Sequence, residues 1–318
     1  MSIRVLLFTV LYLFLLSGCI QRSYPPITED SFLFTLNLRD ASLSFVNDKG
    51  EMFAEWKMDE LYTGGVLLPD HDQLLLYGNQ LEQADIYSLS KGERIKQFEV
   101  PEGMTGVLYS KELNEFIFAN KEDRSLYFYN MNGEKIRQAR TGRYPMTLEE
   151  YNGYLYVVNY QDTYLSKINL KTGETVQKIN IPTSSTGLLI RPEEGELLVG
   201  GHGQGTKPQS SVQIISLESG RKVGELYAPL MPVDFLEEEG CLYILSHGTN
   251  MIYRYNQEKI LTEERPIGAN PFEVESFGSK IAVAGYDNNK VYFLHPDTLT
   301  IEKEIKVGEG PFIIFVKE

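Results

Sequence analysis

Two of the four histidines in this 318-residue chain stand in glycine-rich segments that follow short apolar runs. His202 lies in Gly200-Gly201-His202-Gly203, and His247 lies in Ser246-His247-Gly248. Neutral imidazoles that face one space could together bind a transition metal. The same side chains could instead cap their loops by hydrogen bonding, with glycine present for backbone reasons. Because two histidines fall short of a full ligand set, a divalent metal is one possibility and no other cofactor is predicted.

A second group consists of charged residues inside apolar segments. These residues are Glu149, Arg191, Asp234, Glu273 and Glu275. On strands that surround a central axis, alternate residues would face that axis. Several carboxylates and one arginine could then hold a cation or a cationic ligand. The alternative is a water-filled channel with solvated carboxylates, and a one-residue change of register would move each side chain to the other face.

The segments that carry these residues belong to a degenerate repeat with a period of about 40 residues, which runs from residue 31 to the end of the chain. Each unit reads as a Gly/Pro-rich turn, a short apolar strand, a strongly apolar strand and two alternating strands joined by a glycine-containing turn. Four antiparallel strands in a unit of this length are typical of a propeller blade.

The two ends of the chain complete one repeat between them. First strands are expected near Val66, Val107, Met146, Leu188, Val233, Phe272 and Phe312. The strand at 312–317 has no strands after it, and residues 32–58 supply three strands with no first strand before them. The sequence therefore predicts an all-β, seven-bladed β-propeller whose C-terminal strand (312–317) pairs with the N-terminal blade strands (32–58). This pairing would close the ring and remove exposed strand edges.

Alignment of the repeats brings one residue from each of six units to the position directly after the second strand. These residues are Asn79, Lys121, Tyr160, His202, His247 and Tyr286. Loops on a rigid scaffold often carry binding residues, so Tyr160, His202, His247 and Tyr286 are candidates for ligand binding. The loop at 203–211 is several residues longer than the same loop in the other repeats, and it is either a binding loop or a tolerated insertion.

One repeat has a recognisable motif. Tyr156-Val157-Val158-Asn159, with Gly142 and Pro145 before it and Thr172-Gly173 after it, resembles the YVTN family of β-propeller repeats. The Gly-x-x-Pro element recurs at 268–271 and 308–311, and the resemblance covers about residues 31–318. It implies a propeller in an extracytoplasmic or surface protein with a binding role, and it implies fold and location more than chemistry.

The N-terminal residues differ from the repeat. The predicted organisation is a lipoprotein signal peptide at 1–18, a lipidated tether at 19–30 and the propeller at 31–318. The apolar run at 5–16 is too short for a comfortable membrane span. Leu16-Ser17-Gly18-Cys19 resembles the bacterial lipobox, which implies cleavage before Cys19, lipidation of its thiol and anchoring of the protein to a bacterial membrane. The alternative is an uncleaved N-terminal anchor.

Charge and motifs limit the function classes. Lys and Arg number 30 against 44 Asp and Glu, so the formal net charge is −14 and no nucleic-acid partner is expected. Nucleophile-elbow, zinc-protease and phosphate-loop motifs are missing, and no catalytic residue can be assigned. The sequence favours an extracytoplasmic, membrane-anchored binding module for a protein, peptide, glycan or small ligand. The alternative is a lactonase-like hydrolase, possibly metal-assisted, that uses the channel carboxylates with His202 and His247.

Overall fold

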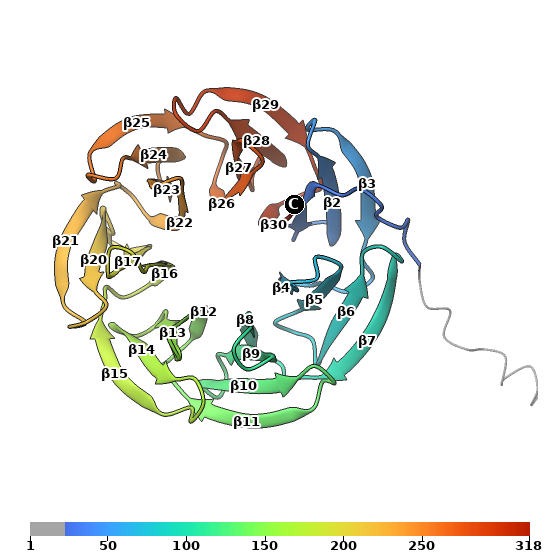
Figure 1. Cartoon of the computed structure of the whole chain (residues 1–318), viewed down its shortest axis with the longest axis horizontal. Helices are drawn as coiled ribbons and strands as arrows, with labels where there is room; N and C mark the ends of the chain where they lie inside the picture. The colour runs from blue at the N-terminus through green and yellow to red at the C-terminus, as the bar shows by residue number, and fades with distance from the viewer. Residues whose placement is uncertain (1–22) are drawn as a thin grey trace, which may run out of the picture.

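The computed structural model describes residues 23–318, which contain no helix. They form seven four-stranded antiparallel sheets and one two-stranded hairpin. The sheets stand as blades around a central axis, with the first strand of each blade innermost and the fourth at the circumference (Figure 1). The predicted seven-bladed propeller is therefore confirmed. No part of residues 23–318 forms a helix with the length and apolarity that a membrane crossing requires. The predicted signal peptide and Cys19 lie outside the described residues.

The strands occupy four concentric positions. The first strands are β4 (Gly64–Leu67), β8 (Met104–Ser110), β12 (Pro145–Tyr151), β16 (Ser185–Arg191), β22 (Pro232–Glu238), β26 (Pro271–Phe277) and β30 (Pro311–Lys317). The second strands are β5 (Gln73–Tyr77), β9 (Glu115–Asn120), β13 (Tyr154–Asn159), β17 (Glu196–Gly201), β23 (Cys241–Ser246), β27 (Lys280–Gly285) and β1 (Phe32–Asn37). The third strands are β6 (Gln83–Ser88), β10 (Ser125–Asn130), β14 (Tyr164–Asn169), β20 (Ser211–Ser216), β24 (Met251–Tyr255), β28 (Lys290–Leu294) and β2 (Ser42–Asn47). The fourth strands are β7 (Glu93–Glu99), β11 (Lys135–Arg140), β15 (Thr175–Asn180), β21 (Lys222–Tyr227), β25 (Leu261–Pro266), β29 (Ile301–Lys306) and β3 (Met52–Lys57).

The ring is closed by strands from the two ends of the chain. β30 pairs antiparallel with β1, from Phe32 opposite Lys317 to Leu36 opposite Ile313, and β2 and β3 complete this blade. The predicted closure is confirmed. This pairing covers the edge of β1, and β30 has an unpaired edge only on the channel side, like the other first strands.

The hydrophobic core is divided among the junctions between blades. Seven clusters of buried apolar side chains occur, one between each pair of neighbouring blades. In β13, Leu155 and Val157 pack toward the blade of β8–β11, whereas Tyr156 and Val158 pack toward the blade of β16. Second strands are therefore apolar on both faces. Side chains alternate between the two neighbouring blades and not between the axis and the outside.

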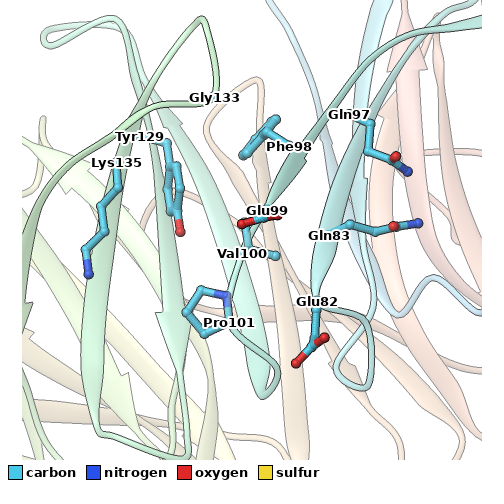
Figure 2. A pocket seen from close by; sticks show the side chains of 10 residues that line it. All are labelled: Glu82, Gln83, Gln97, Phe98, Glu99, Val100, Pro101, Tyr129, Gly133 and Lys135. Atoms are coloured by element: carbon cyan, nitrogen blue, oxygen red, sulfur yellow. The ribbon is translucent and has the colours of Figure 1, made fainter.

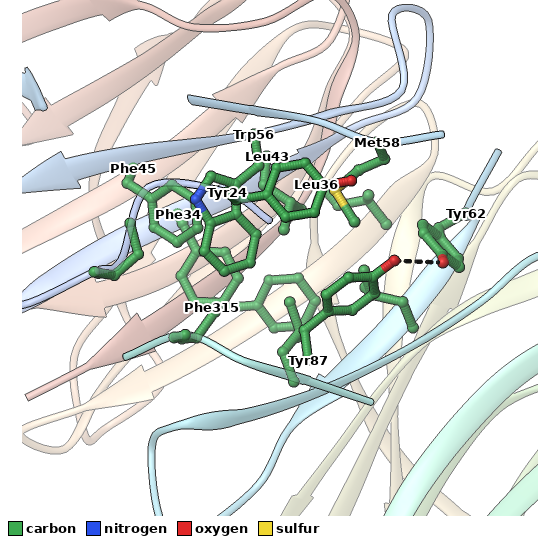
Figure 3. Packing of buried hydrophobic residues seen from close by; sticks show 14 of the residues in the cluster. Tyr24, Phe34, Leu36, Leu43, Phe45, Trp56, Met58, Tyr62, Tyr87 and Phe315 are labelled. Atoms are coloured by element: carbon green, nitrogen blue, oxygen red, sulfur yellow. Dashed lines mark hydrogen bonds between the residues drawn. The ribbon is translucent and has the colours of Figure 1, made fainter. Parts of the chain in front are cut away.

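The segment before β1 strengthens the junction between the first two blades of the sequence (Figure 3). Tyr24 stacks on the fully buried Trp56 with ring centroids 4.9 Å apart, and the Trp56 Nε1–H donates to the Pro25 carbonyl at 3.0 Å. The Tyr24 N–H donates to the Gly92 carbonyl at 2.6 Å, and a Cβ at Gly92 would lie 2.1 Å from the Tyr24 oxygen. The last part of the predicted tether, residues 24–27, is thus docked on the propeller.

Candidate functional site

Six of the seven first strands carry a β-bulge near one end, where pairing with the second strand skips one or two residues. A bulge turns the residues that it leaves unpaired away from the regular faces of the strand. The bulge residues are Thr105, Met146, Thr147, Thr186, Val233, Phe272 and Phe312. All of them line one cavity at the centre of the ring, which we call the channel mouth.

The loop before each bulge has a residue with positive φ at the same place. These residues are Gly103, Tyr144, Ser184, Met231, Asn270 and Gly310. The carbonyl of this residue accepts the N–H of the residue after the second strand, as Tyr144 does from Tyr160 at 2.9 Å and Ser184 does from His202 at 2.9 Å. The same bond fixes Lys121, His247 and Tyr286. The structure therefore places the aligned residues of these blades at equivalent positions around the mouth.

The cavity at the mouth measures about 510 Å³, which is within the range of small-molecule pockets. The bulges contribute Met146, Val233, Phe272 and Phe312 to its apolar wall. Tyr160 and His202 contribute from the loops above the bulges.

Aromatic rings form a continuous arc around this mouth. Starting from Tyr144, neighbouring ring centroids are 5.7 Å apart to Tyr160, 6.1 Å from there to His202 and 5.1 Å from His202 to His247. The arc continues from His247 to Phe272 at 4.9 Å, and Phe272 lies 5.0 Å from Phe312 and 5.5 Å from Tyr286. Such rings offer a large contact area at low cost in side-chain entropy, as in other aromatic binding surfaces.

A cation lies beside the ring at each end of the arc. The Arg39 guanidinium is 4.4 Å from the Tyr286 ring centroid and pairs with Asp287 at 2.5 Å. The Lys121 ammonium lies 5.8 Å from the Tyr144 ring centroid. Both cations are at the rim, and neither lines the cavity itself.

The two histidines lie next to each other in adjacent blades. Their rings meet almost at right angles, and the Nδ1 atom of each is buried without a hydrogen-bond partner. Burial lowers the pKa of both imidazoles, and the neighbouring His247 lowers the pKa of His202 further, so both rings are neutral at neutral pH. Within residues 23–318, no three side chains of His, Cys, Asp or Glu are grouped so that they could hold a metal ion.

The predicted channel carboxylates bond to the free edge of the next first strand. The Asp234 Oδ2 accepts the Val274 N–H at 2.8 Å, and the Glu149 Oε2 accepts the Ile190 N–H at 3.4 Å. Glu273 accepts a backbone N–H from Ile314 in the same way. Innermost strands have no partner on the channel side, so these side chains satisfy backbone donors that no strand can reach.

Burial raises the pKa of every carboxyl in this group. The pKa of Glu149 rises to about 7 and that of Glu275 to about 8, in both cases mainly because of desolvation. The Asp234 charge raises both further, and the Ile190 N–H opposes the increase at Glu149. Desolvation also raises the pKa of Asp234 against the opposing effect of its N–H donors. Glu273 is raised by desolvation and by the charges of Asp234 and Glu275. Asp234 and Glu273 line the mouth, whereas Glu149 and Glu275 lie further along their strands.

Arg191 does not join these carboxylates. Its side chain is 3% exposed and pairs with Glu237 at 2.7 Å and with Glu196 at 3.3 Å. Lys259 also pairs with Glu196, at 2.5 Å. Arg191 is the last residue of β16, at the end opposite its bulge, so the structure places it in an ion cluster between two blades and away from the mouth.

Two other surface features differ from the mouth. Residues 203–211 form the small hairpin of β18 (Gly203–Gln204) and β19 (Lys207–Pro208), and none of them lines the mouth cavity.

A groove of about 1050 Å³ runs along the circumference between two blades, with Glu99 and Lys135 among its side chains (Figure 2). Its polar side chains come from β6 and β7 of one blade and from β11 of the next, and they do not converge on one point.

Part of this candidate site could be predicted from the sequence and part could not. Tyr160, His202, His247 and Tyr286 were identified from the alignment, and the structure brings all four into the arc. The bulge residues were missed as site residues. A signal existed, because Met146, Phe272 and Phe312 each follow the proline of a Gly-x-x-Pro turn.

Comparisons with known proteins establish the fold. No protein-family model matches the chain, and no curated protein matches it in sequence. Among solved structures, a protein of unknown function from Desulfotomaculum acetoxidans DSM 771 has a TM-score of 0.75 at 10% identity, over 90% of this chain and 98% of its own. Kuenenia stuttgartiensis hydrazine synthase has a TM-score of 0.72 at 17% identity, over 88% and 98%. AztD from Citrobacter koseri has a TM-score of 0.62 at 9% identity, over 91% and 98%. At these identities the similarity shows the propeller fold alone.

Proposed function

We propose that this protein is a lipid-anchored, extracytoplasmic β-propeller that binds a small organic molecule at the channel mouth. The observation that supports the proposal most directly is the convergence of bulge residues and loop aromatics from successive blades on one cavity. A scaffold needs no more than buried contacts between blades for stability, so aromatic side chains directed into a central cavity require another explanation.

The anchoring part of the proposal depends on the lipobox-like segment at 16–19. The resemblance to YVTN repeats, which remains a prediction, supports the same location. A docked segment at 24–27 would keep the chain between Cys19 and the propeller short.

A ligand screen with matched variants tests the proposal. We expect some compounds of a small-metabolite library to raise the melting temperature of the wild-type protein. Phe272→Ala and Tyr160→Ala should remove that increase, because each deletes one ring of the arc. The control is Tyr227→Ala, which deletes an exposed ring on the fourth strand β21. A library without stabilising compounds, or stabilisation that both mouth variants retain, would contradict the proposal.

A hydrolase is the second candidate, and a specific observation supports it. Glu149 has its pKa raised to about 7, which is suitable for general acid–base catalysis at neutral pH. The Asp234 charge contributes to this raised pKa, and Asp234 itself lines the mouth. A lactone and ester panel tests this candidate. Turnover that Glu149→Gln abolishes would favour the hydrolase over a binding module.

A further inference from the structure

The charges inside the cavity are of one sign. Of the residues from 23–318 that line it, Asp234 and Glu273 are the two with formally charged side chains, and both are acidic. Asp234 accepts the backbone N–H groups of Val274 and Phe235, and Glu273 accepts that of Ile314. Because a carboxylate has about four lone-pair positions, each of the two still has acceptor capacity for a ligand. Basic residues stay at the rim, where Arg39 is already paired with Asp287.

The wall around these carboxyls is aromatic. Tyr160, Phe272 and Phe312 line the same cavity as Asp234 and Glu273. Ring faces carry negative electrostatic potential and attract cations, and this attraction is strongest where water is excluded. The carboxyls and the rings therefore favour the same kind of ligand, a positive charge attached to an apolar group.

We propose that the channel mouth binds a small organic cation, an ammonium compound with an apolar body, between the aromatic arc and the carboxyls of Asp234 and Glu273. This inference rests on the proposed binding function and specifies its ligand class. The ammonium would lie deep in the mouth against the two carboxyls, and the apolar body would contact Phe272, Phe312 and Tyr160.

A sugar is the main competing ligand, because aromatic rings also stack on sugars. Sugar recognition requires several free polar side chains, whereas among the three threonines of the wall only the Thr186 hydroxyl has no hydrogen-bond partner. The Thr147 Oγ1–H donates to the Thr186 carbonyl at 2.6 Å, and the Thr105 Oγ1–H donates to the Pro145 carbonyl. The structure thus favours the organic cation.

Ionisation of the mouth links binding to pH. Desolvation raises the pKa of Asp234 and Glu273, so these carboxyls must release protons to pair with a cation. His202 and His247, whose pKa values are lowered, would gain charge and repel the cation only at lower pH. The other charged groups around the mouth are Glu149, Glu275, Lys121 and the pair of Arg39 with Asp287. Affinity for the cation should rise as the pH increases from 6 to 8.

Two probes of the same shape test the inference. Choline and its uncharged carbon analogue, 3,3-dimethylbutan-1-ol, are titrated into the full propeller by calorimetry at pH 6 and pH 8. We expect choline to bind at least ten-fold more tightly than the analogue at pH 8, and we expect this preference to shrink at pH 6. Equal binding, preference for the neutral probe, or no saturable binding of choline would overturn the inference.

Charge-neutral variants locate the effect. Asp234→Asn and Glu273→Gln keep an oxygen for the backbone N–H, and each should weaken choline binding at least ten-fold while leaving the neutral probe unchanged. Glu99→Gln, in the groove of Figure 2, is the matched control and should bind choline as the wild type does. Choline binding that both mouth variants retain would also overturn the inference.

The outcomes separate this inference from the proposed function. If a neutral compound or a methyl glycoside binds and Phe272→Ala removes its binding, the mouth is a ligand site and only the cation assignment is wrong. If no compound depends on Phe272 or Tyr160, the proposed function itself is wrong.

Discussion

Replacement of the buried carboxyl of Glu149 by an uncharged amide should stabilise this propeller at pH 8. Glu149 has a pKa of about 7 in the folded protein against an ordinary value of 4.5, mainly because of desolvation. Below pH 4.5 the group is protonated in both states and has no effect on stability. Between these two values the unfolded chain loses its proton first, so the free energy of unfolding falls as the pH rises, and above pH 7 the loss is complete.

The size of this effect follows from the difference in pKa. At about 1.4 kcal/mol for each pH unit, ionised Glu149 lowers the free energy of unfolding by about 3 kcal/mol at pH 8. In Glu149→Gln the amide oxygen can still accept the Ile190 N–H, and no charge has to be desolvated. With an unfolding entropy of about 2 cal/mol/K for each residue, the melting temperature of a domain of this size should rise by about 5 °C.

Scanning calorimetry from pH 4.5 to pH 8 measures the difference. The variant should match the wild type at pH 4.5 and exceed it progressively up to pH 8. Glu258→Gln, at an exposed position, is the control and should follow the wild type at every pH. If Glu149→Gln and the wild type lose stability in parallel between pH 5 and pH 8, the description of a desolvated channel carboxyl is wrong.

Three further predictions concern closure and anchoring. Deletion of residues 312–318 removes β30 and exposes the edge of β1, so the truncated protein should aggregate, as measured by light scattering. A soluble, fully folded truncated protein would contradict the pairing of β30 with β1. Trp56→Ala should lower the free energy of unfolding by roughly 3–5 kcal/mol because it leaves a cavity under Tyr24. Trp56→Phe should lower it by only about 1 kcal/mol, through the lost hydrogen bond to Pro25 and some lost packing. Equal effects of the two variants in denaturant titrations would argue against the stacking contribution. Cys19→Ser should abolish incorporation of labelled lipid and release the protein from the membrane fraction, and unchanged labelling would refute lipidation at this residue.

The fold could be predicted because every blade repeats the same apolar pattern. A second strand such as β13 must be apolar on both faces to fill two junctions, and this gives a signal that survives large variation in sequence. The closure by β30 followed from counting, since three strands at one end of the chain require a fourth from the other end.

The channel end of each blade was harder to predict, for a physical reason. A bulge inserts a residue before Asp234 and before Glu273, so strict alternation from the paired strand fails at the mouth. Side chains near the axis also point toward the neighbouring blade, as Glu149 does toward Ile190. The sequence groups Arg191 with the carboxylates because it is on a first strand, but Arg191 ends β16 on the side opposite the bulge and pairs there with Glu196 and Glu237.

Binding of a small molecule in the channel mouth can be seen directly. A crystal structure of the protein with the most strongly stabilising compound of the ligand screen tests it directly. We expect the compound to lie between Tyr160, Phe272 and Phe312, with its polar group toward Asp234 and Glu273. An empty mouth, with the compound in the circumferential groove beside Glu99 and Lys135 or elsewhere on the surface, would contradict it.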